Sequence, residues 1–512
     1  MPEYLTPGVF INETPRLPPH IVSASSHIAI FIGYTERQKL NGLSLLNIPT
    51  KINSLPEFER FFGGDALHQF NIDTTQGAQV PDLTLANKGY SLNQCSQNFL
   101  LYRSIVLFFN NGGSTCYVVS VGHYGANISP NSLLNGLKAI THDIPASIVL
   151  IPDAVALDNQ NDCTAVQHAL LSHCSQKSAK RFAIVDIYQG YLASNRANQN
   201  DCIDSFCHNI GSQNLSYAAA YYPWINTSIV GANDLHFTAI KAIAKLKTLL
   251  SAELNIQYSQ RDKKQHIMRQ YVQGIIDMLP ENGLDPHKQK QSAQTQKAHQ
   301  MLLSASPFYQ ALFTTMAEKL SLLPPSGAVC GAYVFTDLST GVWKAPANIS
   351  LTSVISPCQL VNNQLQQDMT VTPSGKSVNA IRNFIGQGVL IWGARTLAGN
   401  DNEWRYINIR RTMNMIEKSI EEALKGLAQE PNDHNLWTTA RTMIDNYLMQ
   451  LWRTGALAGA KPDEAYFVRV GINQTMTYTD IQKGHLIVEL GISMRKPAEF
   501  TLLKIIQTVS AS

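Results

Sequence analysis

The 512-residue sequence has no long apolar run, no strong excess of charge and no leader-like N-terminus. No stretch reaches the roughly 18 apolar residues that a membrane-spanning helix needs, and the first residues lack the basic and apolar regions of a signal peptide. The formal net charge is only +3, and no basic run stands out. We therefore expect synthesis in the cytoplasm without a signal peptide, no nucleic acid partner and no direct membrane insertion.

Cysteine is also sparse, with eight residues scattered along a long chain. Zinc ligands usually occur in pairs separated by two to four residues. The candidate ligands here fall into two irregular groups: Cys163, His168, His173 and Cys174, then Cys202, Cys207 and His208. The spacing favours reduced, buried thiols in a protein folded in the cytoplasm. We expect no metal site and no cofactor.

Residues 21–230 alternate between short apolar runs and amphipathic segments, which is typical of a mainly parallel sheet covered by helices. The expected strands are 27–34, 116–121, 147–153, 181–187 and 217–222. The expected helices are 54–64, 99–110, 133–141 and 165–174. Ser54 supplies a helix N-cap, and the glycines after 62 and 111 supply stop signals.

Strand signals disappear between residues 231 and 323, where apolar residues recur at helical spacing. We interpret this region as a helical insertion that contains a polar, Gln/Lys-rich stretch from Pro286 to Gln300. The Gly/Pro/Ala-rich segment from Pro324 to Val334 then predicts loops packed closely against other backbone.

A long amphipathic helix is predicted from Glu403 to Leu427. Its apolar stripe contains Ile409, Met413, Ile416, Ile420 and Leu424, and its other face carries Arg410, Arg411, Glu417, Lys418, Glu421, Glu422 and Lys425. A second helix is expected from near Asp433, followed by strands at 465–470 and 485–494. By base rate, the charged face is simply solvated.

Both ends of the sequence indicate extended arms. Five prolines within Met1–Pro19 forbid a helix, while Val9, Phe10 and Ile11 could form a short edge strand. The C-terminal residues Phe500, Leu502, Lys504 and Ile506 lie in an apolar, strand-like tail with nothing after it to pair with. Such a strand needs an open sheet edge, which another molecule could supply.

The C-terminal quarter resembles the contractile tail sheath proteins of phage tails, R-type pyocins and extracellular contractile injection systems. The resemblance is carried in order by WGART at 392–396, WRYINIRR at 404–411, EPND at 430–433, LWRTGAL at 451–457 and KPAEF at 496–500. Weaker similarity extends upstream through TPGV at 6–9, FFGG at 61–64, FNNGG at 109–113, IPD at 151–153 and YYPW at 221–224.

The resemblance implies an α/β plus α+β protein. An N-terminal arm (1–20) would precede an outer, mainly parallel sheet domain (21–385) of subtilisin-like architecture. That domain would contain the helical insertion (232–322). A C-terminal α+β inner domain (386–497) and a strand arm (498–512) would follow. Glu417, Lys418, Glu421, Glu422 and Lys425 would then be candidates for a helix face turned toward an inner tube.

The resemblance also implies a structural subunit that polymerises as stacked rings around an inner tube and contracts to drive that tube through a target envelope. The expected partners are other copies of the chain, the tube protein, baseplate and terminal cap proteins, and related sheath paralogues. The chain would then be part of an assembled tail-like particle, which could be released from the cell.

Two other classes remain open from the sequence. One is a non-contracting cap or baseplate component that shares the sheath fold. The other is a serine hydrolase, because the sheet domain of sheaths is subtilisin-like. A hydrolase would need Ser, His and Asp brought together with an oxyanion hole. The sequence lacks the His-Gly-Thr and Gly-Thr-Ser-Met segments of that enzyme family, and it lacks a Gly-x-Ser-x-Gly elbow. We expect no catalytic activity.

Overall fold

The computed structural model describes residues 20–75, 80–194, 201–258, 263–279, 293–370, 372–427 and 430–496. These residues fall into two compact units. The larger unit runs from Ser25 to Asn414, and the smaller one combines the residues up to Ala24 with Met415–Lys496. The boundary falls inside helix α12 (Ile407–Lys425). Each unit is described separately.

The larger unit is organised around a sheet of nine strands within the described chain, in the order β14, β17, β16, β11, β10, β9, β1, β8, β4. Neighbouring strands from β16 to β8 are parallel, whereas β17 and β14 at one edge and β4 at the other pair antiparallel. The bounds are β1 (Ala29–Thr35), β4 (Thr50–Ile52), β8 (Cys116–His123), β9 (Ile148–Leu150), β10 (Phe182–Asp186), β11 (Ala218–Tyr222), β14 (Ile349–Ser350), β16 (Asn379–Phe384) and β17 (Gly388–Trp392). The predicted α/β architecture with a mainly parallel sheet is confirmed.

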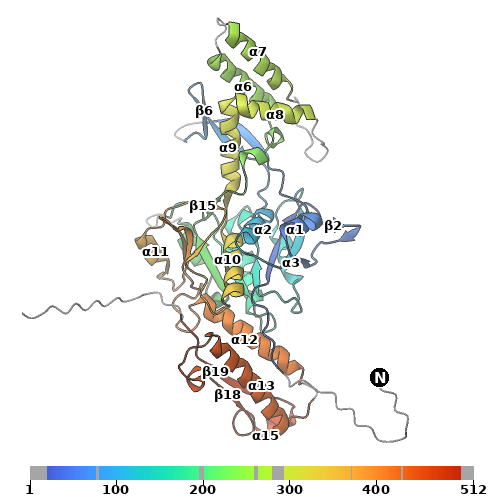
Figure 1. The fold of residues 1–512 in the computed structure, drawn as a ribbon, viewed down its shortest axis with the longest axis vertical. Helices are drawn as coiled ribbons and strands as arrows, with labels where there is room; N and C mark the ends of the chain where they lie inside the picture. Colours follow the sequence, from blue (N-terminus) through green and yellow to red (C-terminus); the bar gives the residue numbers. More distant parts are fainter. Residues whose placement is uncertain are drawn as a thin grey trace, which may run out of the picture. The chain divides into compact units, whose positions relative to one another are not determined.

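The central strands are apolar along their whole length because helices and loops cover both faces of the sheet. Every residue of β1, β9, β10 and β11 is buried. The surrounding helices, several of which are labelled in Figure 1, are α1 (Leu55–Phe62), α2 (Leu101–Asn110), α3 (Pro130–Lys138), α4 (Gln160–Ser175), α5 (Cys202–Asn209), α10 (Ser326–Ser339) and α11 (Asn363–Thr370). Short strands complete the unit: β2 (Lys39–Leu40), β3 (Leu43–Ser44), β12 (Ile225–Thr227), β13 (Leu322–Leu323) and β15 (Val354–Pro357).

Helix α10 corrects the loop prediction for Pro324–Val334. The segment contains two glycines one helical turn apart, Gly327 and Gly331. They account for its glycine-rich composition and for its assignment to a loop. A Cβ atom on Gly327 or Gly331 would collide with the backbone carbonyl of Ser104 or Phe108 on α2. The small residues therefore permit close contact between two helices, rather than marking a loop. The expectation of close backbone packing was correct, and the assigned secondary structure was wrong.

Two buried carboxylates fix these same helices to the sheet. Asp153, which follows β9, accepts hydrogen bonds from the backbone N–H groups of Leu100 and Leu101 at the start of α2 and from Tyr34 N–H. Asp186, the last residue of β10, accepts hydrogen bonds from the backbone and hydroxyl of Ser326 at the start of α10. Burial raises the pKa of Asp153 to about 6 and that of Asp186 to about 7, although these hydrogen bonds oppose the shift. Both groups act as helix caps supplied from elsewhere in the chain.

A second hydrophobic core lies in what we term the accessory region, defined as β5–β7 together with α6–α9. Its helices are α6 (Ile243–Gln257), α7 (Lys263–Asp277), α8 (Ala293–Ala305) and α9 (Pro307–Ser321). Its strands are β5 (Phe70–Thr74), β6 (Leu83–Leu85) and β7 (Lys88–Gln94). The sequence predicted the helical insertion but missed α8, which begins inside the polar stretch. It also missed that Phe70, Ile72 and Leu92 of the small sheet share this core.

The smaller unit contains the second half of α12, α13 (His434–Arg453), two short helices and one hairpin-like sheet. The remaining bounds are α14 (Pro462–Ala465), β18 (Tyr466–Val470), α15 (Tyr478–Gln482) and β19 (Val488–Ile492). Helix α13 starts near Asp433, as the sequence indicated, and Asp433 caps it by accepting a hydrogen bond from Leu436 N–H. Residues 386–414 group with the larger unit, in which β17 pairs with β16 and β14.

The α2–α10 contact generates a prediction about stability. Replacing Gly331 with Ala should lower the free energy of unfolding by about 1–3 kcal/mol, because the added methyl group meets Phe108 carbonyl oxygen and Asn111 Cβ. Gly274→Ala on α7 is the matched control, since no atom lies within 4 Å of its added Cβ. The control should be neutral or slightly stabilising. Urea unfolding of the purified subunit tests this, and equal midpoints for the two variants would contradict the close packing.

Candidate assembly site

The smaller unit presents an incomplete sheet. β18 and β19 pair antiparallel from Tyr466 with Ile492 to Val470 with Val488. Over these two strands, the backbone that the structure describes gives each strand one neighbour only. A two-stranded sheet is marginal by itself, and its outer edges carry unpaired N–H and C=O groups. Just beyond β19, Leu457 and Met494 form an antiparallel bridge and Ala458 N–H donates to the Ser493 carbonyl. Along β18 and β19 themselves, the edges are available for an additional strand.

One face of this sheet is anchored and the other is open. Tyr466, Val468 and Val470 are buried, and the Tyr466 hydroxyl donates a hydrogen bond to the Asp445 carbonyl on α13. Phe467 alternates to the other face and remains 44% exposed, and the Arg469 guanidinium lies 4.7 Å from its ring centroid. The anchored face holds the sheet on α13, while its edges and outer face stay accessible.

Helix α12 displays the predicted stripe. Ile409, Ile416 and Ile420 are buried, whereas Met413 and Leu424 are partly buried. The structure places Glu421, Glu422 and Lys425 in exposed positions, and Glu417 and Lys418 are partly buried. These five charged side chains therefore occupy the less buried side of the helix. Their contact with a tube stays a prediction.

The polar side of α12 is not uniformly solvated, which corrects the sequence interpretation. Arg411 is buried and forms an ion pair with Asp337 of α10, with guanidinium–carboxylate distances of 3.0 and 2.6 Å. Its guanidinium also donates to the Ser26 carbonyl and lies 4.9 Å from the Tyr333 ring centroid. Arg410 is likewise buried, with its guanidinium 3.4 Å from the Trp404 ring centroid. Both arginines are buried against partner side chains. Sequence periodicity cannot reveal such partners.

The segment that leads to the N-terminal arm is fixed within the smaller unit. The backbone N–H of Ala24 donates a 2.8 Å hydrogen bond to the Ser419 hydroxyl on α12. The Tyr447 hydroxyl of α13 donates to the same oxygen, and Ser23 donates to Tyr447. The arm therefore starts from a defined point on two helices. Val9, Phe10 and Ile11 lie outside the described residues, as do Phe500, Leu502, Lys504 and Ile506.

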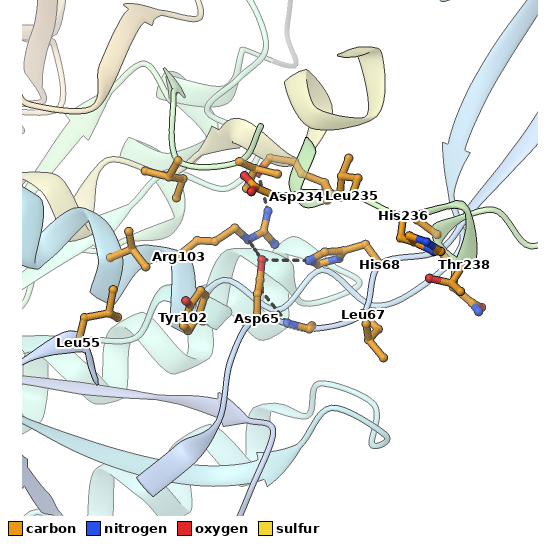
Figure 2. Close-up of a pocket in the computed structure, with 17 residues that line it drawn as sticks. Leu55, Asp65, Leu67, His68, Tyr102, Arg103, Asp234, Leu235, His236 and Thr238 are labelled. Carbon is orange, nitrogen blue, oxygen red and sulfur yellow. Dashed lines mark hydrogen bonds and ion pairs between the residues drawn. The ribbon is translucent and has the colours of Figure 1, made fainter. Parts of the chain in front are cut away.

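A pocket of about 480 Å³ lies where the accessory region joins the sheet (Figure 2). Arg103 of α2 donates hydrogen bonds to the carbonyls of Leu320 and Phe99, and its Nε lies 3.5 Å from Asp65. His68 Nε2 lies 3.6 Å from the same carboxylate oxygen. Burial lowers the pKa of His68, which favours the neutral ring. Because Arg103 bonds the carbonyls of separate chain segments and lies beside Asp65, we interpret this cluster as a structural clamp.

The candidate metal ligands are not assembled into a site. Among the residues that the structure describes, no group of three or more His, Cys, Asp or Glu side chains could hold a metal ion. Cys163, Cys174 and Cys202 are buried, and burial raises the pKa of each thiol to about 12. Such thiols are poor nucleophiles at neutral pH. In the same described ranges, no helix is long and apolar enough to cross a membrane.

A comparison with known protein families matches the C-terminal part of the chain, which includes the sheet of β18 and β19. Residues 399–508 match the family described as phage tail sheath C-terminal domain. A tail sheath protein of Vibrio phage KVP40 is 23% identical over 205 residues. That alignment covers 39% of this chain and 29% of the phage protein's length. The resemblance to tail sheath proteins that the C-terminal motifs predicted is confirmed.

Solved structures extend the similarity in fold to nearly the whole chain. The sheath of an extracellular contractile injection system, PVC, in its contracted state has a TM-score of 0.60 at 23% identity, covering 99% of each chain. The contracted helical sheath of the anti-feeding prophage has a TM-score of 0.60 at 24% identity, covering 98% of this chain and 99% of that one. A contracted anti-feeding prophage baseplate chain reaches 0.61 at 22% identity, with 98% and 99% covered.

The buried ion pair of the larger unit yields a prediction about α12. Either Arg411→Met or Asp337→Leu alone should lower the free energy of unfolding by about 3–5 kcal/mol, because each leaves one buried charge without its partner. The double variant should lose less than either single variant. Urea unfolding of all four proteins completes the thermodynamic cycle. Additive losses in the double variant would show that the two charges do not stabilise each other.

Proposed function

We propose that this chain is the structural sheath subunit of a contractile injection system, polymerising as stacked rings around an inner tube. The observation that carries the proposal is the coincidence of the sheath family match at 399–508 with a sheet whose edges are open. The similarity of fold over 98–99% of the chain to contracted sheath structures supports it. We further propose that the sheet of the larger unit has the subtilisin-like architecture without its catalysis.

The assembly that we propose depends on strand exchange. An arm with alternating side chains can add to the edge of β18 or β19 of a neighbouring subunit and satisfy its exposed backbone groups. The hydrogen bonds of the added strand would hold subunits together while their larger units rotate past each other. Ser419 and Tyr447 fix the start of the N-terminal arm, so a pull on that arm would act directly on α12 and α13.

Contraction would draw its free energy from two states of the same polymer. The extended state would be held by weaker contacts than the contracted one, and release by a baseplate would let the polymer relax in a single stroke. The partners implied are the tube protein, a baseplate, a terminal cap and sheath paralogues within an assembled particle. A chain of this kind has no need of catalysis, and a serine-directed probe that labelled the purified protein would contradict the proposal.

A terminal cap or baseplate-associated component is the second candidate. It is favoured by the match to an anti-feeding prophage baseplate chain, whose TM-score is as high as those of the sheath chains. Electron microscopy of the protein expressed alone separates the two functions. A sheath subunit should form tubes or stacked rings, and a cap or baseplate component should not.

The first assembly prediction concerns the C-terminal arm. Deletion of residues 499–512 should give a folded, soluble subunit that does not polymerise, because the added strand is lost. Deletion of 508–512 alone is the matched control and should still assemble, since it keeps Phe500 to Ile506. Negative-stain microscopy and sedimentation measure the outcome. Tubes of normal length formed by the longer deletion variant would contradict a role of the C-terminal arm in polymerisation.

The second assembly prediction concerns α12. Lys418→Glu with Lys425→Glu should reduce tube-filled, extended particles, because reversed charges weaken docking to a complementary tube surface. Single exposed ion pairs contribute only about 0–1 kcal/mol, so the effect depends on repetition around every ring. The isolated subunit's melting temperature should change little, and raised salt should weaken the same contact in wild type.

The control for this charge reversal is Lys461→Glu with Lys483→Glu, which changes the charge equally at two exposed positions of the same unit. Particles co-produced with the tube protein are counted by microscopy at low and high salt. Equal losses in both double variants would assign the effect to net charge. Unchanged counts for the α12 variant would place the tube contact elsewhere.

A further inference from the structure

Two histidines are in ring contact inside the accessory region. His236 lies on the chain segment between β12 and α6, residues 228–242, which we term the connector. His299 lies on α8 and is only 5% exposed. The ring centroids are 4.6 Å apart, and the ring planes meet at 43°. This histidine pair therefore joins the connector to a helix that is distant in sequence.

The rings around the histidine pair are aromatic. The centroid of Phe237 lies 4.1 Å from that of His236, and the centroids of Phe313 and Tyr309 on α9 lie 5.0 and 5.6 Å from that of His299. His299 Nδ1 is 2.8 Å from the Tyr309 hydroxyl. Both ring nitrogens of His236 are shielded from solvent, and neither has a hydrogen-bond partner among the described residues. Packing alone would therefore be satisfied by a ring that cannot titrate.

The carboxylates that line the pocket beside His236 have other partners (Figure 2). Asp65 lies 3.5 Å from Arg103 and 3.6 Å from His68. Asp234 accepts a 2.8 Å hydrogen bond from a backbone N–H within its own turn. Figure 2 also shows His236 apart from the group formed by Asp65, Arg103 and His68. Each carboxylate therefore already has a partner other than His236.

The helices around α8 add one titratable group at the histidine pair. That group is the phenol of Tyr309, and burial raises its pKa, so it keeps its proton. The buried residues of α7 that the structure describes are apolar. On α6, the buried carboxylate of Glu253 accepts hydrogen bonds from the Ser306 hydroxyl and the Phe308 N–H at the start of α9. Within the described chain, an imidazolium at this place would meet only carboxylates that already have partners.

Burial disfavours the charged form of both rings. Burial and the neighbouring His299 lower the pKa of His236 from its ordinary 6.5 to about 4, and burial lowers the pKa of His299. Both rings are therefore neutral at pH 7.5. If the contact opens, each ring regains a pKa of about 6.5. The contact is then at full strength above pH 6.5 and loses stability as the pH falls from 6.5 through 4.

We propose that the histidine pair is an acid-sensitive latch that holds α8 against the connector. With neutral rings, the latch is an ordinary aromatic contact. A proton on either ring places a charge in an apolar site beside the second imidazole, and this charge gains hydration only when the rings separate. Because α8 shares the second core with α6, α7 and α9, opening the latch loosens the accessory region while the sheet of the larger unit stays folded. The latch goes beyond the sheath function and is independent of it, since a single subunit carries both histidines.

Hydrogen–deuterium exchange of the purified full-length protein, followed by mass spectrometry, tests the latch. Exchange is measured between pH 7.5 and pH 4.5 and is corrected for the pH dependence of the chemical step. Peptides from α8 and the connector should show an opening equilibrium that is at least about tenfold more favourable at pH 5 than at pH 7.5. Peptides from β1 and β10 should stay protected, and return to pH 7.5 should restore the protection of α8. Sedimentation of the same samples records polymerisation separately, so failure of assembly and failure of the latch are distinguishable.

Two variants separate titration from packing. His236→Phe keeps a ring in contact with His299 and removes no hydrogen bond that the described residues make, so it should lose most of the acid response. His299→Gln keeps an acceptor for the Tyr309 hydroxyl and should also weaken the response, because the repulsion between two charged rings is gone. The control His142→Phe changes a histidine of the larger unit whose side chain is 64% exposed, and it should respond as the wild type does. Circular dichroism at pH 7.5 checks that all variants fold.

Three results overturn the proposal. One is unchanged exchange of α8 between pH 7.5 and pH 5 in the wild type, a measurement that needs no variant. Another is a full acid response in a folded His236→Phe variant. The third is parallel opening of β1 and β10, which would show general acid unfolding of the subunit in place of a local latch.

Discussion

The unpaired backbone of β18 and β19 is the constraint on which the proposed assembly depends. A protein normally covers, bulges or charges the edges of its sheets, because open edges pair with other chains. Here, the described part of the smaller unit leaves both edges accessible while α13 holds the inner face through Tyr466, Val468 and Val470. The sheet is therefore held in place but incomplete. Under the proposed function, such a sheet would be stabilised by pairing with a strand of another copy, and polymerisation would follow from the same physics.

Buried polar contacts and close helix packing tie the elements around the sheet of the larger unit together. Buried carboxylates at the ends of β9 and β10 cap α2 and α10, and two glycines bring these helices into close contact. The ion pair of Arg411 with Asp337 then joins the first half of α12 to α10. Well-packed cores are not continuously deformable, so a large motion must occur between bodies rather than within them. Such packing would suit the proposed polymer, whose subunits would change neighbours without changing fold.

Sequence periodicity was reliable where one buried face decides the structure. The parallel strands, the stripe on α12 and the start of α13 near Asp433 were all predicted because local pattern and burial agree. Sequence periodicity failed where contacts with a distant segment determine the structure. Gly327 and Gly331 were assigned to a loop because the helix that they contact, α2, is distant in sequence. Arg411 was assigned to a solvated face because its partner Asp337 is 74 residues away in sequence. The contribution of β5–β7 to the accessory core had no local signal.

The residues of the proposed assembly show the same contrast between local pattern and distant contacts. The sequence predicted a C-terminal tail in need of an edge, and this tail lies outside the described residues. The sequence did not show that β18 and β19 pair with each other to form a two-stranded sheet. It named the charged residues of α12 in advance, and the structure places three of the five, Glu421, Glu422 and Lys425, in exposed positions. The anchoring of the N-terminal segment by Ser419 and Tyr447 could not be predicted, since it joins positions hundreds of residues apart.

The most direct test of strand exchange is a cryo-electron microscopy map of the tubes that the protein forms alone. The account predicts that the sheet of β18 and β19 in every subunit gains at least one further strand, and that continuous density traces this strand to the arm of a different copy. A map in which this sheet keeps two strands, or in which each arm returns to its own subunit, would contradict the account.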